Sequence, residues 1–79
     1  MMKVTLPELG EGIDKATITY WHFEVGDSVQ TNDDLVEVAT DKATFNVPSP
    51  CSGILTEVTA PEGETIHVGE VMAVIDEDK

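Results

Sequence analysis

Residues 35–47, LVEVATDKATFNV, contain the pattern that decides the fold: two apolar-leaning runs flank the pair Asp41-Lys42. The runs Leu35–Ala39 and Ala43–Val47 have the length of strands and contain β-branched or aromatic residues. Aspartate suits a tight turn because its carboxylate can accept hydrogen bonds from nearby backbone N–H groups. The stretch therefore predicts a β-hairpin with Lys42 exposed at its tip and Asp41 supporting the turn.

The rest of the chain also alternates short strand-like runs with turn residues. No window of helical length carries a clean apolar stripe with the helical period, and turn signals recur at short intervals. This pattern is typical of an all-β sandwich or small barrel. The other expected strands are Ala16–Phe23, Ile54–Val58 and Val71–Ile75, with short pieces near Lys3–Leu6, Ser28–Gln30 and Thr65–His67.

An internal repeat relates the two halves of the chain at an offset of 37 residues, which is the separation of Gly63 from Gly26. Two halves with the same strand and turn pattern can each cover the apolar face of the other, which predicts a pseudo-twofold sandwich. Lys42 lies where the halves meet and its mate, Lys79, lies at the free end. A twofold axis would put these lysines at opposite ends of the molecule. The pairs that keep their chemical type include Ile18 with Leu55, Val29 with Ile66, Leu35 with Met72, and Val38 with Ile75.

Composition limits the class of protein. Seventy-nine residues allow one domain, and the single cysteine, Cys51, excludes an internal disulfide. No zinc-ligand spacing and no stretch long and apolar enough to cross a bilayer are present. The net charge of −12, from 16 acidic residues and 4 lysines, argues against binding nucleic acid or an anionic membrane. The acidity serves solubility, attraction to a basic face of a partner, or both.

Lys42 is the only lysine or arginine between Lys15 and Lys79. An enzyme that modifies one lysine needs a free amine on a fixed backbone, with neighbours small enough to admit its active site. Ala39 and Ala43 meet the last requirement. Spacing alone leaves two interpretations: an ordinary surface lysine at a hairpin tip, and a modification site.

Short motifs in a fixed order extend the argument to nearly the whole chain. They are LPELGEG at 6–12, Trp21, VGD at 25–27, LVEV at 35–38, TDKA at 40–43, VPSP at 47–50, Gly53, EG at 62–63 and VG at 68–69. Together they resemble the lipoyl domain of the dihydrolipoamide acyltransferase component of 2-oxo acid dehydrogenase complexes. The resemblance implies a flattened barrel of two four-stranded antiparallel sheets, of the biotinyl/lipoyl-carrier type. It also implies that residues 1–79 are a single carrier domain, which we expect to come from the amino-terminal end of a larger acyltransferase.

The same resemblance implies a cofactor and a mechanism. Lipoic acid would be attached to Lys42 as an amide by a lipoate-attaching enzyme, with Asp41 and Ala43 as the flanks of the site. A thiamine-diphosphate-dependent 2-oxo acid decarboxylase would reductively acylate the lipoyl group, which would deliver the acyl group to coenzyme A at an acyltransferase catalytic domain. Dihydrolipoyl dehydrogenase would then reoxidise it. The domain itself would be a monomeric swinging-arm carrier without catalytic residues or metal.

The loop at residues 9–14 resembles the family segment that lies near the lipoyl-lysine and helps partners to recognise the domain. It is interpreted as a docking surface for the decarboxylase or as a glycine-rich turn between two strands, and both can hold together. Its sequence is closer to the pyruvate and branched-chain types than to the 2-oxoglutarate type. The family occurs in bacterial cytoplasm and in the mitochondrial matrix. The residues of the loop are Leu9, Gly10, Glu11, Gly12, Ile13 and Asp14.

Three other functions can be compared with that of a lipoyl carrier. A biotin carrier domain has the same architecture, but methionines usually flank its modified lysine. In this chain the residues that flank Lys42 are Asp41 and Ala43. A plain β-sandwich interaction module would carry no modification. An enzyme would need a nucleophile and a base, for which Cys51, His22 and His67 are the candidates. Cys51 has no helix start or adjacent cation to lower its pKa, and the acyltransferase's catalytic histidine motif is absent.

Overall fold

The computed structural model describes residues 1–77, which form eight β-strands and no helix. This confirms the all-β class, and no helix in this range is long and apolar enough to cross a membrane. The paired positions Asp78 and Lys79 of the repeat lie outside the described residues. The strands are β1 (Met2–Thr5), β2 (Lys15–Trp21), β3 (Ser28–Val29), β4 (Asp34–Ala39), β5 (Thr44–Pro48), β6 (Gly53–Val58), β7 (Thr65–His67) and β8 (Val71–Asp76).

The strands form two four-stranded antiparallel sheets, with the orders β1-β8-β6-β3 and β5-β4-β2-β7. This is the flattened two-sheet architecture expected from the sequence, and the molecule measures 38 × 21 × 17 Å along its principal axes. The strand boundaries differ from expectation by at most two residues, and β7 has the expected bounds. Thus β2 ends at Trp21 because the chain turns at Glu24–Asp27, and β5 begins after Ala43 because Ala43 belongs to the hairpin turn.

The core lies between the sheets and takes equivalent side chains from both halves of the repeat. Ile18 and Leu35 in one sheet, and Leu55 and Met72 in the other, have no measurable exposure. Each buried side chain of this size contributes about 1.5–3 kcal/mol relative to the exposed state. The two sheets therefore cover each other's apolar face, and each sheet contains strands from both halves of the repeat.

The pseudo-twofold symmetry extends to the irregularities of the sheets. The β2–β4 ladder shifts its register between Ile18 and Tyr20, and the β6–β8 ladder shifts between Leu55 and Glu57, which is the same position at the 37-residue offset. Strand β1 lies on the edge of one sheet in the place that β5 takes in the other. The two halves therefore have equivalent strand pairing, including the positions of the register shifts.

Three turns are closed by an acidic side chain in one common arrangement. The N–H of the first residue donates to the carboxylate of the fourth, and the N–H of the fourth donates to the carbonyl of the first. Some of the acidic residues therefore stabilise turns, in addition to the roles in solubility and in attraction to a basic partner that the composition indicates. The carboxylate bonds are Glu24 N–H to Asp27 (2.8 Å), Gln30 N–H to Asp33 (2.9 Å) and His67 N–H to Glu70 (2.6 Å), the last two related by the repeat.

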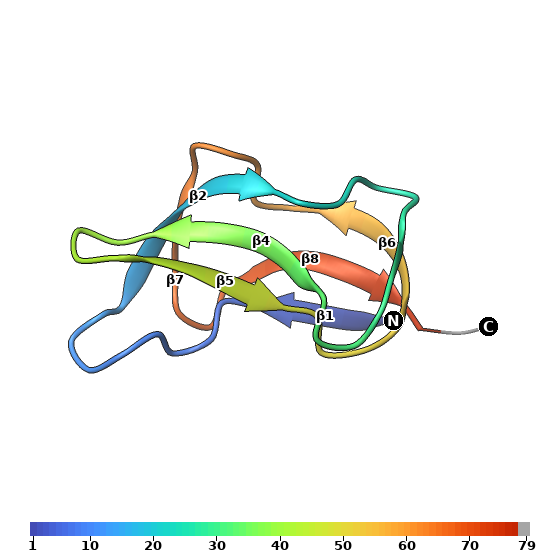
Figure 1. The fold of residues 1–79 in the computed structure, drawn as a ribbon, viewed down its shortest axis with the longest axis horizontal. Helices are drawn as coiled ribbons and strands as arrows, with labels where there is room; N and C mark the ends of the chain where they lie inside the picture. The colour runs from blue at the N-terminus through green and yellow to red at the C-terminus, as the bar shows by residue number, and fades with distance from the viewer. Residues whose placement is uncertain (78–79) are drawn as a thin grey trace.

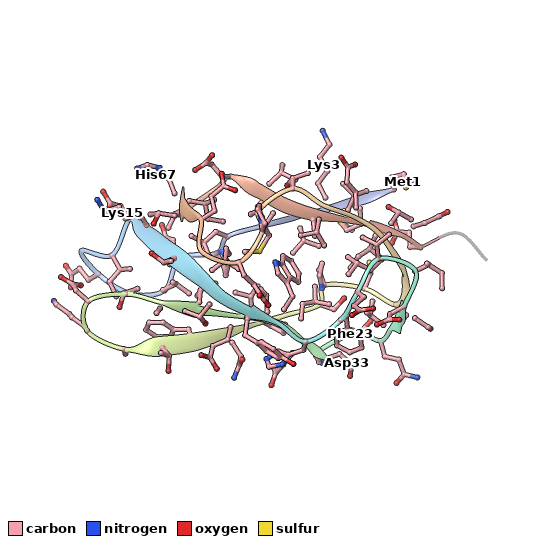
Figure 2. All side chains as sticks on the ribbon, turned by 90° about the horizontal axis from the view of Figure 1, so that it is seen from above. Met1, Lys3, Lys15, Phe23, Asp33 and His67 are labelled. Atoms are coloured by element: carbon pink, nitrogen blue, oxygen red, sulfur yellow. The ribbon has the colours of Figure 1, made fainter. Side chains whose placement is uncertain are left out.

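The connection between β4 and β5 lies at one end of the long axis, and the first and last strands open at the other (Figure 1). Met2 pairs with Ile75, so the beginning of β1 and the end of β8 lie side by side. Figure 2 shows Lys15 and His67 toward the hairpin end and Met1 toward the opposite one. The fold thus separates the tip that carries Lys42 from the strands through which the chain enters and leaves.

Candidate functional site

Lys42 is exposed at the tip of the β4–β5 hairpin, as the sequence predicts. The last pair of the ladder is Ala39 with Thr44, and beyond it the Thr40 N–H donates to the Ala43 carbonyl at 2.8 Å. Asp41 and Ala43 are exposed as well. Within residues 1–77, the Lys42 ammonium has no ion-pair partner. The structure therefore presents a free amine on a backbone held by two paired strands.

The turn at the tip is closed by the hydroxyl of Thr40. Its Oγ1 accepts hydrogen bonds from the N–H groups of Lys42 (3.2 Å) and Ala43 (3.1 Å), and it donates to the Ala43 carbonyl (3.1 Å). The Asp41 carboxylate accepts no hydrogen bond from the described part of the chain. The expectation that Asp41 supports the turn is therefore wrong. The signal that could have identified Thr40 is a threonine directly before a two-residue loop, since its hydroxyl can bond to the following N–H groups.

The loop at 9–14 lies against the hairpin tip. An open groove of about 560 Å³ separates them, lined on the loop side by Gly12–Asp14 and on the hairpin side by Ala39–Lys42. Leu9 packs on the core and anchors the loop, and the Ile13 N–H donates to the Gly10 carbonyl at 3.1 Å. Gly12 has a φ of 81°, a conformation in which a side chain would be strained. The segment that the resemblance associates with the modified lysine thus does lie beside it.

The end of the molecule around Lys42 is acidic. Glu11 and Asp14 are exposed on the loop, Glu8 is exposed directly before it, and Asp41 is exposed on the hairpin. Lys15 is the other cation toward this end (Figure 2). Converting the Lys42 amine to an amide would remove a positive charge and make the end more acidic still.

The residues considered for an enzyme have other surroundings. Burial raises the pKa of the half-buried Cys51 thiol, and the Glu77 carboxylate raises it further, which disfavours the nucleophilic thiolate. His22 Nε2 lies 3.2 Å from the Asn46 side-chain oxygen, and His67 contacts Glu70. Among residues 1–77, no group of histidine, cysteine and acidic side chains is arranged to hold a metal ion.

The surroundings of Lys42 fit a covalently attached cofactor that carries acyl groups. The Lys42 amine is exposed, its flank Ala43 is a small residue, and the adjacent groove leaves space on the side of the loop. These features suit a lysine that must enter the active site of a modifying enzyme and then carry a long arm. The fold and the site together define a two-sheet β-barrel that displays Lys42 at a hairpin tip.

Comparison with known proteins gives the family. The model of the biotin/lipoyl family, described as biotin-requiring enzyme, matches residues 2–75, and the chain belongs to this family. The chain is 46% identical over 72 residues to the dihydrolipoyllysine-residue acetyltransferase component of the pyruvate dehydrogenase complex of Corynebacterium glutamicum, and these residues are 91% of the chain and 11% of that protein. It is 44% identical over 77 residues to the succinyltransferase component of the 2-oxoglutarate dehydrogenase complex of Staphylococcus saprophyticus, covering 98% of the chain and 18% of that protein.

A solved structure supports the same assignment. The lipoyl domain of the 2-oxoglutarate dehydrogenase complex of Azotobacter vinelandii matches the whole chain over its own whole length, with a TM-score of 0.78 and 26% identity. The resemblance to lipoyl domains that the motifs indicate is thereby confirmed. The chain spans less than a fifth of the length of the two curated relatives described above.

Proposed function

We propose that this domain is a swinging-arm carrier in which Lys42 bears lipoic acid as an amide on its Nζ. The observation that carries the proposal is the free, exposed Lys42 amine at the tip of a rigid hairpin, in a chain of the biotin/lipoyl family. Asp41 and Ala43 flank the site without the methionines typical of biotin carriers. When bound, the lipoyl group supplies a dithiolane that accepts an acyl group and releases it to coenzyme A.

The residues of the domain contribute presentation and delivery. The paired strands fix the backbone at the base of the arm, so the α-carbon of Lys42 defines the centre of the volume that the arm can search. Tethering raises the local concentration of the arm at each partner without tight binding of the domain. The domain has no catalytic role of its own in this proposal.

We propose four partners, in line with the relatives, which are named as components of 2-oxo acid dehydrogenase complexes. They are a lipoate-attaching enzyme, a thiamine-diphosphate-dependent 2-oxo acid decarboxylase, an acyltransferase catalytic domain, and dihydrolipoyl dehydrogenase. The 9–14 loop, which includes Leu9, Gly10, Glu11, Gly12, Ile13 and Asp14, would be the docking surface for the decarboxylase, because its residues 12–14 form one wall of the groove beside Lys42. The acidic character of this end favours a basic face on the partner.

The parent protein and its location follow from the same relatives. Because the chain matches only 11% and 18% of their length, we propose that residues 1–79 are one carrier domain at the amino-terminal end of a larger acyltransferase. These relatives are bacterial proteins, which favours the bacterial cytoplasm over the mitochondrial matrix.

Intact-mass measurement after incubation with lipoate ligase, lipoate and ATP tests the modification. One lipoyl increment is expected on the wild-type chain and none on Lys42→Ala. Lys15→Ala is the matched control, since Lys15 is also exposed and lies toward the same end; it should keep the increment. A folded wild-type sample without any increment would contradict the proposal, and a biotinyl increment with biotin ligase would favour a biotin carrier.

Reductive acylation of the lipoylated domain tests the decarboxylase partner. We expect purified pyruvate or branched-chain decarboxylase to acylate it faster than 2-oxoglutarate decarboxylase, because the 9–14 loop is closer in sequence to those types. Glu11→Gln and Asp14→Asn should slow acylation while lipoylation stays unchanged, and Glu57→Gln on β6 is the control. Equal rates for the loop variants and the wild type would remove the docking role of the loop.

A further inference from the structure

The turn at Asp41-Lys42 has a backbone conformation that is unusual for a tight hairpin. The two-residue loops that match the twist of paired strands, types I′ and II′, need a positive φ at one or both loop residues. Among residues 1–77, Asn32 is the only residue other than glycine with a positive φ, so Asp41 and Lys42 both avoid it. A lysine resists this conformation because its Cβ would approach the backbone. Placing lysine at the tip therefore calls for another way to close the turn.

The closing bond is supplied by a side chain. The Ala43 N–H donates to the Thr40 hydroxyl at 3.1 Å, whereas a regular tight turn would direct it to the Thr40 carbonyl. The same hydroxyl receives the Lys42 N–H at 3.2 Å and donates to the Ala43 carbonyl at 3.1 Å. One oxygen thus fixes both peptide groups next to the Lys42 α-carbon.

The repeat provides an independent indication. Position 40 corresponds to position 77 at the 37-residue offset, and the residues there are threonine and glutamate. Chemical type is kept at buried paired positions of the strands, and the acidic residue that closes the turn is kept at positions 33 and 70. The hydroxyl therefore belongs to the hairpin tip alone and is not a requirement of the strand pattern.

We infer that Thr40 is the positioning residue for lipoylation of Lys42: its hydroxyl holds the turn in the conformation that the lipoate-attaching enzyme recognises. This inference rests on the proposed function. Thr40 acts through the backbone, while Asp41 is left without a hydrogen bond from residues 1–77. The side chain of Asp41 is therefore free to contact the modifying enzyme.

Substitutions that separate shape from hydrogen bonding test the inference. Thr40→Val keeps the volume and the β-branch but removes the hydroxyl, and Thr40→Ser keeps the hydroxyl. With lipoate ligase, lipoate and ATP, kcat/KM for lipoylation should fall about tenfold in Thr40→Val, because the hydrogen bonds that define the turn are lost. Thr40→Ser should stay near the wild-type value. The control is Thr59→Val, which removes a hydroxyl bond to the Val71 carbonyl (2.9 Å) outside the hairpin; it should lipoylate like the wild type.

Amide hydrogen exchange provides a second readout that does not depend on the enzyme. In the wild-type protein, the N–H groups of Lys42 and Ala43 should exchange more slowly than the N–H of Asp41, and Thr40→Val should remove this difference. Lipoylation of Thr40→Val at the wild-type rate, or equal exchange of the three amides in the wild type, would overturn the inference. A wild-type protein that shows the protected amides but takes up no lipoyl group would instead contradict the proposed function.

Discussion

At the hairpin tip, three adjacent residues differ in what they contact. Thr40 bonds to the turn, Lys42 offers its amine to solvent, and the Asp41 carboxylate accepts no hydrogen bond from residues 1–77. Aspartate is common in turns because of its hydrogen bonds, so its presence here needs another reason. A recognition contact with the modifying enzyme or with the decarboxylase is consistent with its exposure.

Substituting Asp41 separates these roles. Asp41→Asn should leave the free energy of unfolding within about 0.5 kcal/mol of the wild type, because an exposed side chain without partners contributes little. Urea unfolding followed by Trp21 fluorescence measures this difference. Asp33→Asn is the contrasting variant: the Asp33 carboxylate accepts the Gln30 N–H at 2.9 Å, and replacing this charged acceptor by a neutral amide oxygen should cost about 1 kcal/mol. A loss of that size in Asp41→Asn would show that Asp41 does support the turn.

The thiol of Cys51 is expected to be slow to react. Burial raises its pKa above the usual value of 9.0, and the Glu77 carboxylate adds to the increase through charge repulsion and a hydrogen bond. Since only the thiolate reacts, alkylation by iodoacetamide at pH 8 should be slower in the folded protein than in urea. Glu77→Gln should lower the pKa and increase the rate, and Glu57→Gln should not. A folded-state rate equal to the unfolded-state rate would contradict this.

At the scale of elements, the strands and turns show what sequence patterns can establish. The positions of the strands can be predicted from apolar periodicity and turn residues, because both are local properties of the sequence. The repeat also predicts the equivalence of the sheets, which rests on matched apolar positions such as Ile18 and Leu55. The choice between the Thr40 hydroxyl and the Asp41 carboxylate could not be made, because it depends on the φ angles at the tip. The groove likewise depends on how the 9–14 loop folds back on the hairpin.

The turn that joins β7 and β8 should depend on pH. The His67 N–H donates to the Glu70 carboxylate, and this hydrogen bond lowers the pKa of Glu70 below its usual value of 4.5. A lowered pKa in the folded state means that the contribution to stability is complete above pH 4.5 and is lost as the pH falls through the folded-state pKa. Glu70→Gln should therefore be less stable than the wild type at pH 7, and the two should converge in acid. Urea unfolding across this range measures the difference; a difference that persists unchanged in acid would exclude the carboxylate as its source.

Gly53, at the beginning of β6, lies close to the backbone at the end of β8. A Cβ at this position would clash with the backbone carbonyl of Asp76, which no side-chain rotation can relieve. Gly53→Ala should therefore destabilise the domain by about 1–3 kcal/mol, as overpacking does elsewhere. Ile54→Ala is the control on the same strand, because Ile54 is 41% exposed and its truncation should cost less. Equal denaturation midpoints for Gly53→Ala and the wild type would show that β8 can shift at no cost.

At the scale of the whole molecule, the 38 Å long axis separates the hairpin tip that carries Lys42 from the beginning of β1 and the end of β8. Met2 and Ile75 pair at the end away from Lys42. Fusion of a folded protein before Met1 or after Lys79 should therefore leave kcat/KM for lipoylation unchanged. Comparison of the two fusions with the free domain, under the same ligase conditions, measures this. A strong decrease for either fusion would mean that the modifying enzyme reaches beyond the hairpin end.

The place of β1 in the symmetry has a consequence for how many arms the barrel can carry. In one half, β4 continues through the tip into β5; in the other, β8 ends where β1 begins, so the equivalent tip is an opening in the chain. A duplicated half-barrel with both tips closed would have two equivalent positions for a lysine arm. Here the opening in the chain replaces one of these two tips. The end of the domain without a closed tip is therefore the end at which it can be joined covalently to a longer chain. Under the proposed function, the acyl group and the connection to a longer chain would therefore lie at opposite ends of a nearly symmetric domain, and one domain would carry one acyl group at a time.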